Sequence, residues 1–117
     1  MSQQLSLSPT QSISSATERR AAVRYQCSTS ASCSSLAPFE RLSGVLRNIS
    51  SGGMALILGT SIREGTELVI DLKTKNPGIR LTLLARVVHS TSNEEGSWII
   101  GCEFITTPTE EQIQALL

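Results

Sequence analysis

Residues 81–104 read LTLLARVVHSTSNEEGSWIIGCEF, and this stretch decides the fold. Apolar residues recur at every second position in two runs, which are Leu81, Leu83, Ala85 and Val87, then Trp98, Ile100, Cys102 and Phe104. A period of two is the spacing of a β-strand with one buried face. Between the runs lies Asn93–Gly96, whose Asn and Gly favour a turn. The stretch therefore predicts two neighbouring strands joined by a turn.

Upstream, the same kind of pattern predicts four more short strands, at about 23–36, 42–49, 54–58 and 68–73. Pro38 ends or bends the first of them, and Gly-containing turns separate the others. In the second strand, alternation places Val45, Arg47 and Ile49 on one face and Leu46 and Asn48 on the other. Short strands at this spacing favour a small antiparallel barrel, whose closure leaves few exposed edges.

Residues near the C-terminus predict a short helix. Thr107 is a suitable N-cap, Pro108 fits the first helical position, and Glu110 follows three residues after the cap. Ile113, Leu116 and Leu117 then form one apolar stripe. So short a helix is marginal alone, and we expect it to pack on the barrel.

Length and charge narrow the class of protein. A chain of 117 residues builds one domain, and with one Trp, one Tyr and two Phe its core must be aliphatic. Residues 1–17 show no periodic apolar face and are expected to form a flexible tail before a domain at 18–117. Ten basic and ten acidic residues cancel, which argues against general nucleic-acid binding. A small RNA- or DNA-binding barrel would also need clustered aromatic residues, which the chain lacks.

Other classes find little support. Cys27, Cys33 and Cys102 have no paired close spacing, so free thiols are expected, and a metal site that adds His89 is disfavoured. No nucleophile with its base stands out, so the chain is not expected to be an enzyme. His89 is expected to be an ordinary strand residue. Trp98 is expected to be part of the core or of the barrel rim. No apolar run is long enough for a membrane span, and no signal peptide is evident, which favours the cytoplasm.

Two polar motifs stand out against this background. Arg20 and Arg24 form an Arg-x-x-x-Arg pattern, and Asn48, Ser50 and Gly53 form Asn-x-Ser-x-x-Gly. A guanidinium fork matches phosphate oxygens or the paired acceptors of guanine, and an Asn amide can meet a guanine edge. The residue types therefore suit a small anionic nucleotide.

In this order and separation, the motifs resemble the two signatures of the PilZ family of bacterial cyclic di-GMP receptors, with a resemblance from about Glu18 to the C-terminus. The resemblance implies a six-stranded barrel followed by a C-terminal helix. It also implies cyclic di-GMP contacts from Arg19, Arg20, Arg24, Asn48, Ser50 and Gly53, with no cofactor or metal. Arg19, just before the first motif, resembles the arrangement that binds two stacked nucleotides per chain. In this picture the Arg segment becomes ordered on binding and signals to an unidentified protein partner.

Alternatives remain open from the sequence. The three arginines of residues 19–24 could be a solvated basic entry to the first strand, and Asn48–Gly53 could be an ordinary turn. The main functional alternative is a PilZ-like interaction module that binds no nucleotide.

Overall fold

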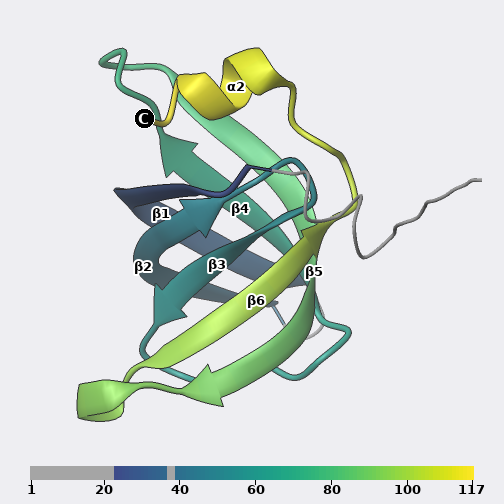
Figure 1. Ribbon diagram of the computed structural model, residues 1–117. Helices are drawn as coiled ribbons and strands as arrows, with labels where there is room; N and C mark the ends of the chain where they lie inside the picture. The colour runs from purple at the N-terminus through teal and green to yellow at the C-terminus, as the bar shows by residue number, and fades with distance from the viewer. Residues whose placement is uncertain (1–22, 37–38) are drawn as a thin grey trace, which may run out of the picture.

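Six antiparallel strands close into a barrel in the computed structural model, which describes residues 23–36 and 39–117 (Figure 1). The order around the barrel is β1-β2-β3-β6-β5-β4. The strands are β1 (Tyr25–Leu36), β2 (Phe39–Ile49), β3 (Gly53–Leu58), β4 (Glu67–Lys73), β5 (Arg80–Ser92) and β6 (Trp98–Phe104); η1 (Glu94–Gly96) is a short 3₁₀ turn and α2 (Glu110–Gln114) a C-terminal helix. The predicted barrel with a short C-terminal helix is confirmed. The predicted tail at 1–17 and the bend at Pro38 lie outside the described residues.

An aliphatic core fills the barrel, as the composition predicts. Strands contribute alternate residues, so Leu68, Ile70 and Leu72 of β4 are all fully buried. Each such side chain contributes about 1.5–3 kcal/mol through removal from water. Trp98 packs against this core from the barrel rim, as predicted. Cys33 and Cys102 also point inward as free thiols, and burial raises their pKa to about 11 and about 12.

Two irregularities in strand pairing change which side chains at the end of β2 face the core. Leu46 pairs with Leu56 of β3 but Asn48 pairs with Ala55, so Arg47 is an extra residue, and a second shift separates Gln26 from Thr29 in β1. The bulge reverses the alternation, because Leu46 and Ile49 are both buried while Arg47 is exposed. The predicted grouping of Ile49 with Val45 and Arg47 is therefore wrong. Strict alternation fails wherever one strand carries an extra residue.

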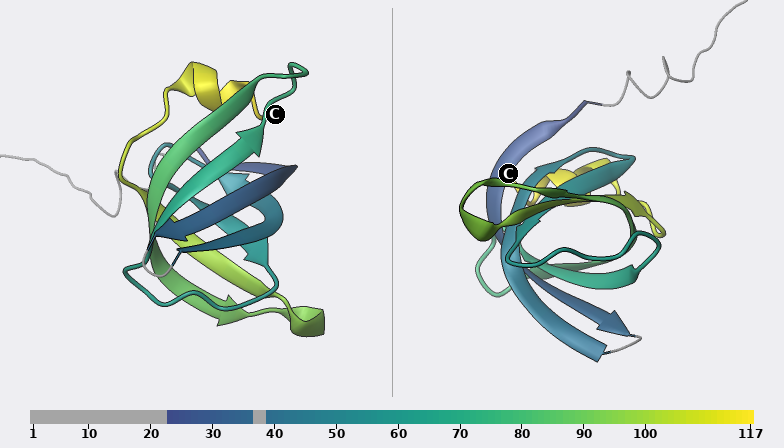
Figure 2. Two further views of the ribbon diagram at one scale, coloured as in Figure 1. Left: turned by 180° about the vertical axis from the view of Figure 1, so that it is seen from behind. Right: turned by 90° about the horizontal axis from the view of Figure 1, so that it is seen from below.

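Helix α2 lies across one open end of the barrel, beside the β4–β5 connection (Figures 1 and 2). Ile113 and Leu116 are buried, as predicted, but Leu117 is 41% exposed. The cap is Thr109 and not the predicted Thr107: Gln112 N donates to Thr109 Oγ1 at 3.1 Å, and Thr109 N donates to Gln112 Oε1 at 2.9 Å. The sequence contains a capping pattern at both threonines, and the reciprocal pair forms at the second. None of the helices among the described residues has the length and apolar character to cross a membrane.

Candidate functional site

The Asn-x-Ser-x-x-Gly motif spans the end of β2, the turn that follows and the first residue of β3. Ser50 closes this turn with three hydrogen bonds: its N–H donates to Gly53 O at 2.9 Å, its hydroxyl donates to the same oxygen at 3.4 Å, and its Oγ accepts from Gly52 N at 3.2 Å. The Ser50 residue is only 7% exposed. A hydroxyl with this many local partners fixes the turn, which is a structural role that the motif alone does not reveal.

Gly53 is required by the neighbouring strand. A Cβ placed on Gly53 would lie 2.3 Å from the carbonyl oxygen of Cys102 in β6, far inside van der Waals contact. Gly53 is not among the glycines with positive φ, so its freedom is used for close approach between strands. The close approach at Gly53 is therefore between β3 and β6, which gives this glycine a structural role.

Asn48 is the second-last residue of β2 and follows the bulge at Arg47. Its Oδ1 atom is buried and has no hydrogen-bond partner among the described residues. Leaving a buried carbonyl-type oxygen unpaired costs about 1–3 kcal/mol, so native structures rarely keep one without a reason. Asn48 therefore presents an acceptor whose donor must come from elsewhere.

Arg24 reaches the same turn from the start of β1. Tyr25, the next residue, pairs with Ile49, so the backbone register places Arg24 opposite Ser50. The Arg24 Nη1 atom donates to Ser50 Oγ at 3.4 Å across 26 residues of sequence. The guanidinium stays exposed, with most of its donors available. Arg19 and Arg20 lie outside the described residues.

Two further side-chain contacts near this turn were not indicated by the sequence. The Tyr25 hydroxyl donates to Glu110 Oε2 of α2 at 3.0 Å, and this hydrogen bond, together with the Glu110 charge, raises the pKa of Tyr25. Arg86 ion-pairs with Glu103, the β6 partner of Gly53, at 3.1 Å. Tyr25 and Glu110 are 85 residues apart. No motif of the sequence pairs these residues, so only the closed barrel could reveal these contacts.

The start of β1 and the end of β2 thus present the Arg24 guanidinium, the unpaired Asn48 Oδ1 and a turn held by the hydrogen bonds of Ser50. His89, the single histidine, packs its ring over Gly101, where an added Cβ would lie 2.2 Å from Nε2. In the described part of the chain, no group of three or more residues could hold a metal ion. The arrangement is suited to binding a ligand that carries both a negative charge, for Arg24, and a hydrogen-bond donor, for Asn48 Oδ1. The fixed turn at Ser50 makes this surface rigid.

Comparison with known proteins points the same way. The model of the PilZ domain matches residues 18–117. No curated protein sequence matches the chain. Among solved structures, the PilZ domain of YcgR from Escherichia coli with c-di-GMP is 20% identical, with a TM-score of 0.62 over 83% of this chain and 87% of that one.

Two further solved structures share the fold. The Bacillus subtilis inhibitor of motility MotI/DgrA is 20% identical with a TM-score of 0.63, covering 81% of this chain but only 46% of that protein. The PilZ domain of CeSA from a cellulose-synthesizing bacterium is 19% identical with a TM-score of 0.52, covering 80% of this chain and 90% of that one. This chain therefore spans just under half the length of MotI.

Proposed function

Because the chain belongs to the PilZ domain family, we propose that it is a receptor for cyclic di-GMP and has no catalytic activity of its own. One observation carries the proposal: Arg24 of the first motif lies 3.4 Å from Ser50 of the second. The two motifs meet at one turn although 26 residues separate these positions. The E. coli YcgR structures, which share the fold, were solved with c-di-GMP.

The chemistry of each residue fits this ligand. Cyclic di-GMP carries two phosphodiester charges and two guanines, so the exposed Arg24 fork can bind a phosphate or the O6/N7 edge of guanine. Asn48 Oδ1, buried without a partner in the described residues, would accept from the guanine N–H donors. Ligand binding would thereby remove a cost present in the free protein.

Arg19 and Arg20 complete the proposed site. Arg20 would bind guanine or phosphate beside Arg24, and Arg19 would stack on a second nucleotide and give two per chain. Contacts made only in the bound state would order the segment that carries these arginines. The ordered segment would form a new surface for a partner protein in the bacterial cytoplasm.

Isothermal titration calorimetry with cyclic di-GMP tests the proposal. We expect binding by the full chain and a loss of at least about tenfold in affinity for Arg24→Ala and for Arg20→Ala, since each removes charge-assisted hydrogen bonds. Arg63→Ala removes an exposed arginine from the β3–β4 connection and is the matched control. Unchanged affinity in both test variants would end the proposal, and one nucleotide per chain would remove the paired arrangement.

A PilZ-like module that binds no nucleotide is the second candidate. It is favoured by the finding that Ser50 and Gly53 already have structural roles, as turn closure and as the contact with Cys102. Such a module would give no calorimetric signal with cyclic di-GMP while keeping the same β-rich circular dichroism spectrum. The same titration therefore separates the two candidates.

A further inference from the structure

Strand β1 is left without a strand partner along part of one edge. It begins at Tyr25, but its pairing with β4 covers only Ala31–Ser35. Beyond Lys73, β4 turns away, and the N–H of Lys75 donates to Ala115 O at 2.8 Å near the C-terminus. The edge of β1 at residues 26–30 therefore has no neighbouring strand on the β4 side among the described residues. An open edge of this kind can pair with an added strand.

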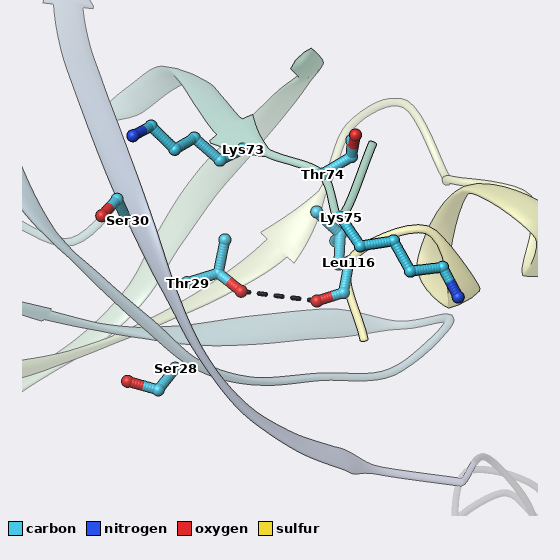
Figure 3. A pocket seen from close by; sticks show the side chains of 7 residues that line it. All are labelled: Ser28, Thr29, Ser30, Lys73, Thr74, Lys75 and Leu116. Atoms are coloured by element: carbon cyan, nitrogen blue, oxygen red, sulfur yellow. Dashed lines mark hydrogen bonds between the residues drawn. The ribbon is translucent and has the colours of Figure 1, made fainter. Parts of the chain in front are cut away.

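A hollow of about 270 Å³ lies along this open edge (Figure 3). Ser28, Thr29 and Ser30 line one side of it, and Lys73, Thr74 and Lys75 line the other. Leu116 lies at its base, where its carbonyl oxygen accepts from Thr29 Oγ1 at 3.4 Å. The hydroxyls of Ser28 and Ser30 are exposed and make no hydrogen bond with described residues. The hollow is thus bounded by a strand edge, free hydroxyls and lysines.

The cations around this hollow are not neutralised. Lys73 pairs directly with Arg80 across the β4–β5 hairpin, and like charges in register destabilise a sheet. Within the described ranges the ion pairs are those of Arg86, so Lys73, Lys75 and Arg80 have none. Asp71, two residues before Lys73, instead accepts a hydrogen bond from Thr82. An external anion would relieve the repulsion between Lys73 and Arg80.

A second hollow of about 320 Å³ adjoins the first, since Lys73 and Thr74 line both. It runs along the hairpin past Arg80 to Ile79, which is 57% exposed. Gly78 at the tip has φ of 83°, which fixes a turn that presents Ile79 outward. The surface that carries Lys73, Lys75 and Arg80 is therefore continuous from the β1 edge to the exposed side chain of Ile79.

We propose that an acidic peptide of a partner protein binds in extended form along the β1 edge at residues 26–30. Successive side chains of an added strand point to opposite faces. Figure 3 shows the Lys73 side chain extending toward Ser30 and the Lys75 side chain extending in the opposite direction, so the two cations are spread along the hollow and more than one acidic residue of the peptide can meet a cation. The whole chain has no net charge, so the attraction comes from this local group of cations. The proposal does not depend on nucleotide binding.

The positive charge of Lys73 and Lys75 favours an acidic peptide over two other possible occupants, which are the N-terminal residues of this chain and a second copy of it. Residues 1–17 of the chain carry no charged side chain, so they offer nothing to Lys73 and Lys75. A second copy pairing edge to edge would place the same lysines against each other, which like-charge repulsion disfavours. Of these three occupants, an acidic peptide is the one that satisfies both the strand edge and the cations.

Fluorescence anisotropy with a labelled decapeptide of alternating Glu and Val tests the proposal on the full chain without nucleotide. We expect saturable binding below about 1 mM that weakens with salt, and none by a Lys-Val decapeptide. The double variant Lys73→Glu/Lys75→Glu should lose at least about tenfold in affinity. Arg41→Glu/Arg63→Glu makes the same charge change at exposed positions outside the hollow and should bind as the parent does.

Amide hydrogen exchange supplies the second readout. Added peptide should slow exchange within residues 26–30, because strand pairing protects backbone N–H groups. No binding, equal loss in the control pair, or binding without this protection would each overturn the proposal. A concentration-dependent dimer that excludes the peptide would assign the edge to a second copy instead and would also overturn it.

Discussion

Strand β1 separates two unlike surfaces of the barrel. Toward β2, Arg24 meets a turn whose Ser50 is almost fully buried and whose Gly53 touches β6. Toward β4, the edge is open and the neighbouring Lys73, Lys75 and Arg80 are exposed. The first surface is defined by backbone geometry, and the second by charge.

Each of the two surfaces carries an unfavourable interaction, and the two interactions differ in kind. On the β2 side the cost is one buried oxygen, Asn48 Oδ1, with no partner in the described chain. On the β4 side it is a like-charge pair, Lys73 with Arg80, in solvent. Burial makes the first cost larger and stereospecific, whereas water and salt reduce the second. We therefore expect changes on the β2 side to have the larger effects.

The largest effect should come from Gly53→Ala. The new methyl group would overlap the Cys102 carbonyl oxygen, and we expect the free energy of unfolding to fall by about 1–3 kcal/mol through overpacking. Urea denaturation measures the change. Gly52→Ala is the control, because the nearest atom to its Cβ is 4.0 Å away. Equal stability of both variants would show that the turn is less rigid than its geometry indicates.

Asn48→Leu should separate stability from binding. Replacing the orphaned oxygen by a similarly sized apolar group should leave the free energy of unfolding unchanged or raise it by about 1 kcal/mol, because an unpaired buried acceptor is removed. Cyclic di-GMP affinity should fall about tenfold, the value of one hydrogen bond. A clear loss of stability would mean that Asn48 supports the fold rather than the ligand.

Arg80→Glu should have a smaller effect of the same kind on the β4 side. Opposite charges would face each other across β4 and β5, and we expect a gain of about 0.2–1 kcal/mol in the free energy of unfolding. Affinity for the acidic peptide should fall at the same time. Thermal denaturation at low and high salt measures the gain, which salt should reduce. A gain insensitive to salt would argue against an electrostatic origin.

The smallest effect concerns Tyr25, which lies between the two surfaces. Its pKa is raised by the hydrogen bond to Glu110, so Glu110→Gln should lower this pKa toward the ordinary tyrosine value. Tyr25 is the single tyrosine of the chain, so absorbance during an alkaline titration reports it alone. An unchanged titration curve would show that α2 and the start of β1 are not coupled in solution.

Sequence patterns predicted the barrel well because alternation at residues such as Leu83, Ala85 and Val87 directly reports the buried face. They placed a turn after the second strand, at Ser50–Gly53, because Ser and Gly favour turns. They could not locate the bulge at Arg47, since an extra residue leaves no mark in composition. They also could not choose between Thr107 and Thr109, because each begins a capping pattern and only the structure shows the reciprocal pair at Thr109.

The cysteines of the barrel offer an experimental handle on the site. At neutral pH the buried thiols of Cys33 and Cys102 stay protonated and enclosed, whereas Cys27 is half-buried and lies three residues from Arg24. A maleimide dye should therefore attach to Cys27 first, even though burial also raises the pKa of that thiol. The fluorescence of the attached dye would then report cyclic di-GMP binding on the β2 side of β1 and peptide binding on the β4 side. No residue of the chain would need to be substituted.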